Sequence, residues 1–292
     1  MSERLWSIDT NTNKVPSLRT SLTSVDQRVH LLFLGDAHFD NAHSDRRALK
    51  RLLDAAIERD AIIVLLGDML DLMGGRDDRR SSKSALRPEH KVDAYFTAVL
   101  DEWVEWYRPY ARNTWIALEG NHCSAVKKHH EFDPTRLWTQ QLNAAGATID
   151  YPGYSTYARI MNRANTRRQS LRFFIHHGYG GGGPVTKGTI QASRRATLYP
   201  DAHFLVSGHI HESWAVTHAQ YRLDHDGKPY EMMQEHYSVG SVKSEFNDGK
   251  GGWWVEKGMG PRPKSGWWCE LKYSAHSGLN FAFTQAKPEM VG

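Results

Sequence analysis

Cysteine is scarce in this chain. Only Cys123 and Cys269 occur among its 292 residues, and two cysteines cannot form the disulfide framework that stabilises small secreted domains. Long apolar runs are missing too, because none approaches the roughly 18 residues that a transmembrane helix needs. We therefore expect a cytoplasmic protein with no membrane partner.

A strong charge of either sign is also lacking. The chain has 37 Lys and Arg against 33 Asp and Glu, which gives a net charge of +4 and a pI near 8.9. This mildly basic balance is weak evidence for an anionic partner. Residues 1–28 are polar and have no apolar segment typical of a signal peptide. We treat them as an N-terminal extension that precedes a single domain, residues 29–292.

Five short polar motifs stand out, and each follows a short apolar run that predicts a buried strand. Polar residues directly after buried strands are expected at one edge of a sheet, where five such ends could build a site for several metal ions. The motifs are Gly35-Asp36-Ala37-His38, Gly67-Asp68, Gly120-Asn121-His122, His176-His177-Gly178 and Gly208-His209-Ile210-His211.

The residue types in these motifs fit metal binding. Asp and Asn supply oxygen and His supplies nitrogen, and this mixture without thiolate suits Mn, Fe, Zn or Ni. A carboxylate can bridge two ions, and Asp68 has no histidine two residues later, which makes it the natural bridge. Asp36 and His38 lie two residues apart, so in an extended chain they would point to the same side. His209 and His211 have the same spacing, and we expect each pair to converge.

The order of these motifs resembles the calcineurin-like metallophosphoesterase superfamily, from about Leu31 to His211. The resemblance implies an α/β fold of two packed β-sheets flanked by helices. It also implies a phosphoesterase with two divalent metal ions, of which Mn is the first expectation and Fe, Zn or Ni the alternatives. The segment 236–268 resembles, more loosely, phosphoesterases encoded by phages.

The resemblance also implies roles for single residues. Asp68 would bridge the two metals, and His122 would contact the scissile phosphate and protonate the leaving group. The fourth motif offers two adjacent histidines, of which we favour His177 because the following Gly resembles the form seen in many members. Cys123 departs from the family, which usually has Asp or Glu there. The implied ligands of the first metal are Asp36, His38, Asp68 and His211, and those of the second are Asp68, Asn121, His177 and His209.

Strand and helix patterns alternate along the chain. Apolar residues at helical spacing predict helices over residues 45–59, 90–107 and 134–145. A largely parallel sheet with outer helices follows from this alternation, and the chain after His211 is β-rich. Asp71 either touches a ligand or a substrate or caps a turn before the glycines at 74 and 75, and we favour the cap. We expect residues 127–130 to form a solvated loop and not a third metal site.

Two segments bear on the substrate. The basic stretch from Arg76 to Arg87 follows Asp68 closely, so it is either a solvated loop or a substrate contact, and we assign Arg76, Arg79 and Arg80 to substrate binding. The Trp-rich segment 252–268 is either a core hairpin or a surface that stacks bases. The favoured substrate is a phosphodiester in DNA, RNA or a nucleotide. The alternatives are a phosphomonoesterase or protein phosphatase, and a metal-binding scaffold without turnover, against which the retained His122 speaks.

Overall fold

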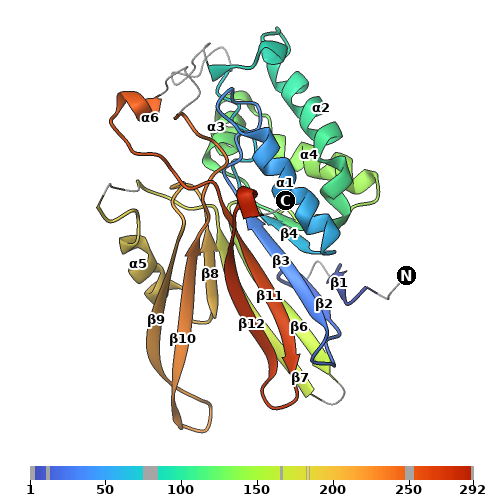
Figure 1. Cartoon of the computed structure of the whole chain (residues 1–292), viewed down its shortest axis with the longest axis vertical. Helices are drawn as coiled ribbons and strands as arrows, with labels where there is room; N and C mark the ends of the chain where they lie inside the picture. Colours follow the sequence, from blue (N-terminus) through green and yellow to red (C-terminus); the bar gives the residue numbers. More distant parts are fainter. Residues whose placement is uncertain are drawn as a thin grey trace.

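Two β-sheets packed face to face, with helices on their outer sides, form the framework of the protein (Figure 1). The computed structural model describes residues 4–10, 14–74, 85–164, 167–181, 183, 185–246 and 253–290. The α/β class with two packed sheets and flanking helices is thereby confirmed.

The five-stranded sheet has the strand order β12-β11-β3-β4-β5. Strands β3, β4 and β5 are parallel to one another. Strand β11 is antiparallel to β3, and β12 is antiparallel to β11. The bounds are β3 Arg28–Leu34, β4 Ile62–Leu65, β5 Thr114–Ala117, β11 Gly266–Ser274 and β12 Gly278–Ala286. The parallel arrangement places the carboxyl ends of β3, β4 and β5 at one edge.

The seven-stranded sheet has the order β1-β2-β6-β7-β8-β10-β9 and mixes parallel with antiparallel pairs. Its strands are β1 Trp6–Asp9, β2 Ser17–Thr20, β6 Ser155–Ala164, β7 Arg167–His176, β8 Phe204–Ser207, β9 Trp214–Leu223 and β10 Pro229–Ser238. The first two strands lie before residue 29, in the part that the sequence set apart as an extension. There Trp6, Leu18 and Leu22 are buried in the core between the sheets.

The α-helices are α1 Arg46–Glu58, α2 Tyr95–Tyr107, α3 Asn121–His130, α4 Pro134–Ala144, α5 Ile190–Leu198 and α6 Trp253–Glu256. Three of them, α1, α2 and α5, connect neighbouring parallel strands, while α3, α4 and α6 lie on connections between the two sheets. Helix α1 begins where the sequence predicts it, because Asp45 accepts a hydrogen bond from the backbone N–H of Ala48 and caps the first turn. Leu49, Leu52 and Leu53 of its apolar face are buried, whereas Ile57 near its end is exposed.

Each parallel strand of the five-stranded sheet is buried on both faces. In β3, Leu31 and Phe33 point into the core between the sheets, while Leu32 and Leu34 pack under the helices. Figure 1 shows α1 to α4 gathered on the outer side of this sheet, while α5 lies beside β9 on the other side of the molecule. Alternate apolar residues thus serve two cores, as expected of parallel strands covered on both faces.

Four features differ from the sequence prediction or were missed by it. Residues 127–130 belong to α3 and do not form a loop, although Lys127, Lys128 and His129 are exposed as expected. Helix α5 and strand β12 were not predicted. The Trp-rich segment is split between α6 and β11 and does not form one hairpin. Within the described residues, no helix combines the length and the apolar character that crossing a membrane requires.

Candidate metal centre

The polar motifs meet where the carboxyl ends of five strands converge. Strands β3, β4 and β5 bring Asp36, His38, Asp68 and the start of α3, while β7 and β8 bring the remaining histidines. Three groups of side chains each have ligand atoms within 4.8 Å of one another. They are Asp36, His38 and His211; Asp68, His177 and His209; and His38, Asp68 and His122.

The first group offers two nitrogens and one oxygen to a common point. The Nε2 atoms of His38 and His211 lie 3.2 Å apart, and Nε2 of His211 lies 3.3 Å from Oδ1 of Asp36. This Asp36 oxygen is buried and has no hydrogen-bond partner among the described residues. A buried carboxylate oxygen without a donor is costly, and a cation held between these three atoms would satisfy it.

The second group centres on Asn121. Its Oδ1 atom lies 3.0 Å from Nε2 of His177 and 2.7 Å from Nδ1 of His209, and Nε2 of His177 lies 3.3 Å from Oδ2 of Asp68. Nδ1 of His177 donates to the carbonyl of Leu66 at 2.7 Å, so that Nε2 faces the group and can bind a cation when its proton is displaced. These donors fit a second cation.

The neighbouring histidine does not join the group. Nδ1 of His176 accepts a hydrogen bond from the backbone N–H of Gly178 at 2.7 Å, and its ring packs against Tyr154 and Tyr179. The geometry therefore favours His177 over His176 as the residue that faces Asp68 and Asn121.

The backbone at five of the seven predicted ligands is left-handed and not extended. Positive φ angles occur at Asp36 (53°), His38 (45°), Asp68 (47°), His209 (74°) and His211 (55°). The expectation that the paired residues converge from extended chain was therefore wrong, although the pairs belong to the cluster. Non-glycine residues with positive φ are uncommon and concentrate at functional sites, where the surrounding structure holds the strain.

The glycines of two motifs are explained by close approach. A Cβ on Gly120 would lie 2.0 Å from Oδ1 of Asp68, and a Cβ on Gly208 would lie 2.4 Å from Oδ2 of Asp36. The freed space lets the following backbone reach these carboxylates: the N–H of His122 donates to Asp68 at 3.0 Å and that of His209 donates to Asp36 at 2.8 Å. Each glycine therefore docks one ligand loop onto the carboxylate of another.

The site carries a concentrated negative charge. Burial opposes ionisation of Asp68, but the adjacent His122 and His177 hold its pKa well below the usual range. Burial alone would lower the pKa of His177, whereas the Asp68 and Asp36 carboxylates raise it to about 9. Carboxylates that draw a proton onto a buried imidazole will also attract a divalent cation.

Comparison with known proteins gives the family. The family model for calcineurin-like phosphoesterases matches residues 29–213. The chain belongs to this family. No curated protein matches it.

Solved structures similar to this phosphoesterase family member are distant in sequence. A predicted phosphoesterase from Streptococcus pneumoniae TIGR4 is 12% identical, covering 90% of this chain and 91% of its own, with a TM-score of 0.34. Vacuolar Protein Sorting 29 from Cryptosporidium parvum is 12% identical over 89% and 98%, with a TM-score of 0.39. GAP50, the anchor in the inner membrane complex of Plasmodium, is 14% identical over 91% and 86%, with a TM-score of 0.46.

His122 sits beside the seven predicted ligands of this family member. Its Nδ1–H donates to the backbone carbonyl of Asp71 at 2.6 Å, and its Nε2 lies 3.8 Å from Oδ2 of Asp68. The side chain is 13% exposed, more than His38 or His177. This hydrogen bond fixes the ring so that Nε2 faces the site, where it could exchange a proton with a bound molecule.

Asp71 contacts a predicted metal ligand, which was the alternative to the favoured turn cap. It does not merely cap a turn, because its Oδ1 accepts a hydrogen bond from Nδ1 of His38 at 2.8 Å and its Oδ2 accepts one from Asn41 at 3.0 Å. Burial disfavours its charge, yet the bond from His38 and the charge of His122 keep its pKa far below normal. Its position three residues after Asp68 was the only signal in the sequence.

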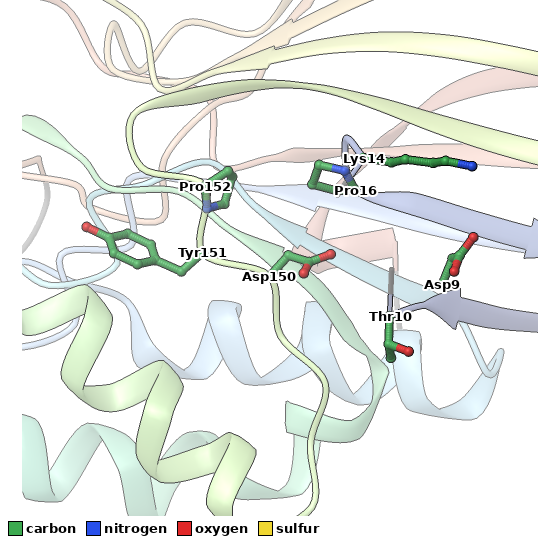
Figure 2. Close-up of a pocket in the computed structure, with 7 residues that line it drawn as sticks. All are labelled: Asp9, Thr10, Lys14, Pro16, Asp150, Tyr151 and Pro152. Carbon is green, nitrogen blue, oxygen red and sulfur yellow. The ribbon is translucent and has the colours of Figure 1, made fainter. Parts of the chain in front are cut away.

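Other predicted residues lie away from the cluster or outside the described part. Arg76, Arg79 and Arg80 fall in residues 75–84, which the structure does not describe. Cys123 is buried in α3, and burial raises the pKa of its thiol. A cavity of about 160 Å³ lies elsewhere, between the β1–β2 connection and the chain after α4 (Figure 2). None of the predicted site residues lines it; its lining includes Asp9, Lys14, Asp150 and Tyr151.

Proposed function

We propose that this protein is a metal-dependent phosphoesterase with two divalent metal ions, and that it hydrolyses phosphodiester bonds in nucleic acids or nucleotides. The observation that carries the proposal is a pair of neighbouring ligand groups: Asp68 belongs to the second and also lies within reach of His38, a member of the first. Divalent metals are typical of the family, and the donor set of carboxylate, amide and imidazole suits Mn, Fe, Zn or Ni.

Seven residues would hold the metals. One ion would take Asp36, His38 and His211, the other would take Asn121, His177 and His209, and Asp68 would serve both. When bound, two such ions stabilise the charge that develops on a phosphoryl group and make water a stronger nucleophile at neutral pH.

The remaining work falls to residues of the chain. Because the Asp71 carbonyl holds Nδ1–H of His122, the ring can deliver a proton from Nε2 to the departing oxygen. Asp71 also fixes the ring of His38 through Nδ1, so that Nε2 is presented to the site. Because Asp71 holds both rings, it would fix the position of the metal ligand His38 relative to the proton donor His122.

The test compares two small substrates. A phosphodiesterase with bound Mn²⁺ should hydrolyse bis(p-nitrophenyl) phosphate faster than p-nitrophenyl phosphate, and EDTA should abolish both activities. Faster hydrolysis of the monoester would identify a phosphomonoesterase. Activity on neither substrate, with two equivalents of metal bound, would identify a scaffold.

The basic residues Arg76, Arg79 and Arg80 remain proposed substrate contacts on sequence grounds. If the substrate is a nucleic acid, their contacts with distant phosphates should weaken steeply with salt. Changing Arg79, Arg80 and Lys83 to Ala should then impair cleavage of an oligonucleotide and flatten its salt dependence, while bis(p-nitrophenyl) phosphate is cleaved nearly as before. Equal loss of both activities would remove this support for a nucleic-acid substrate.

A further inference from the structure

The chain between β10 and β11 runs along the edge of the metal centre; we call its described residues, 241–246 and 253–264, the rim segment. Its first residues are fixed to the metal-binding loops, because the Ser241 hydroxyl donates to the carbonyl of Asp36 at 2.5 Å. Its last residues are fixed to the start of α1, where Lys264 pairs with Asp45 at 2.7 Å. Figure 1 shows α6, within this segment, at the end of the molecule opposite the β9–β10 turn.

Trp254 of the rim segment lies against a predicted metal ligand. Its ring centroid is 4.9 Å from that of His211, at an interplanar angle of 63°. The side chain is only partly buried, unlike Trp267 and Trp268, which are buried in β11. Of the Trp-rich segment, therefore, Trp254 is placed to meet a ligand at the metal centre.

Several contacts hold Trp254 in this position. Its backbone N–H donates to Oε2 of Glu245 at 2.7 Å, and the guanidinium of Arg262 lies 5.5 Å from its ring centroid. Arg262 in turn pairs with Glu212, the residue after His211. An aromatic ring fixed in advance loses little conformational entropy when a second ring stacks on it.

Lys243 brings a positive charge to the same rim. Its Nζ lies 3.4 Å from Oε1 of Glu245 and 4.0 Å from Oδ1 of Asp71, and 13% of its side chain is exposed. Glu245 therefore links the cation and the indole, since one of its oxygens faces Lys243 and the other holds the backbone of Trp254. An ammonium beside a site rich in carboxylates is positioned to meet an anionic substrate.

We infer that Lys243 and Trp254 form a subsite for a phosphoester that carries a planar aromatic group, such as a nucleobase. The ammonium would contact a phosphate oxygen, and the indole would stack on the ring. This inference rests on the proposed function and narrows its substrate class to nucleotides and nucleic-acid ends. The physical basis is that stacking on an aromatic side chain is tolerant of base identity, whereas the cation recognises phosphate alone.

Binding of three phosphates to the metal-loaded protein tests the inference by calorimetry, without requiring turnover. The probes are AMP, ribose 5-phosphate and inorganic phosphate, and AMP should bind tightest to the wild type. Trp254→Ala should weaken AMP about 10-fold, within the range for base stacking, and leave the other two unchanged, while Trp254→Phe keeps most of the affinity. Lys243→Met should weaken all three by about 10-fold or more, as expected for a charge-assisted hydrogen bond.

Matched variants and metal analysis separate this role from a structural one. Val255→Ala and Lys257→Met, both at exposed positions of the rim segment, should change none of the affinities. Equal weakening of all three probes by Trp254→Ala, or loss of metal, would show that Trp254 only supports His211 and would overturn the inference. So would a wild type that binds AMP no tighter than ribose 5-phosphate. Neither result bears on the hydrolysis of small esters, which tests the proposed function separately.

Discussion

The two sheets contribute differently to the metal centre. The five-stranded sheet supplies every oxygen donor, namely Asp36, Asp68 and Asn121, together with His38. The seven-stranded sheet supplies only imidazoles. Neither set is a complete site, so the centre exists only when the sheets are packed against each other. One sheet therefore supplies the negative charge of the centre, and the other completes the set of ligands.

Removing a carboxylate of the five-stranded sheet and an imidazole of the seven-stranded sheet should affect metal binding to different extents. Asp68→Asn should cost at least about 10³-fold in metal affinity, because a unit charge at 4 Å is worth about 4 kcal/mol at an effective dielectric constant of 20. His209→Ala should lose one equivalent and keep the other. Elemental analysis measures both, and two tightly bound equivalents in Asp68→Asn would contradict the bridge.

A change at His122 tests whether both histidines that the five-stranded sheet brings to the centre, His38 and His122, are metal ligands. His122→Ala should keep both metals and lose roughly 10²–10⁴-fold in kcat, the usual contribution of general acid catalysis. The loss should be smaller for esters with a good leaving group, which need less protonation. The control is His129→Ala, an exposed position on the same helix. Equal losses for good and poor leaving groups would count against proton transfer.

Asp71 is not a predicted metal ligand itself, but it accepts a hydrogen bond from the ligand His38. Asp71→Asn keeps an oxygen for His38 but opposes its amide to that of Asn41. We expect metal affinity or activity to fall roughly 10- to 100-fold, as for other hydrogen-bond partners of metal ligands. Asp133→Asn, which removes a charge but keeps an oxygen to cap α4, should leave both unchanged. If the two variants behave alike, Asp71 has no special link to the centre.

Metal removal tests whether the centre joins the sheets. Binding at a hundredfold excess over Kd stabilises a native protein by about 2.7 kcal/mol, which corresponds to a Tm change of roughly 5 °C at this size. EDTA should therefore lower Tm by this amount in the wild type and by much less in Asp68→Asn. The same shift in both proteins would show that the metals do not couple the sheets.

Asp150 lies outside the centre, and its pKa is shifted upward, unlike those of Asp68 and Asp71. Burial raises the pKa of Asp150 to about 6, above its value in the unfolded chain, so the folded state favours the protonated form. The free energy of unfolding should therefore fall as pH rises from about 4 to about 6. Asp150→Asn should remove this loss and stabilise the protein at pH 8 by about 1 kcal/mol, a value reduced for partial exposure. Denaturant unfolding across pH measures it, and destabilisation at pH 8 would contradict the assignment.

The sequence predicts what is local in this protein. A buried strand followed by glycine and a donor is visible in the residues themselves, so the candidate ligands and the parallel strands that carry them were found. Helix α1 was found for the same reason, since its cap and apolar face are contiguous. Helix α3 was missed because residues 127–130 are all polar and because only Cys123 and Val126 form its buried face, which is too few to show a helical apolar pattern.

The features that escaped prediction depend on contacts between distant residues. Asp71 meets His38 across 33 residues, and Trp254 meets His211 only because the rim segment returns to the centre after β10. The left-handed backbone at Asp36 and His209 also occurs where distant loops meet, because the backbone N–H of His209 donates to the Asp36 carboxylate. No local pattern encodes such pairings.

The most direct test is anomalous diffraction from crystals soaked with Mn²⁺. The account predicts two peaks about 3.5–4 Å apart, one contacted by Asp36, His38 and His211, the other by Asn121, His177 and His209, with Asp68 contacting both. A single peak, or a second ion that Asp68 does not reach, would contradict a metal centre shared between the two sheets.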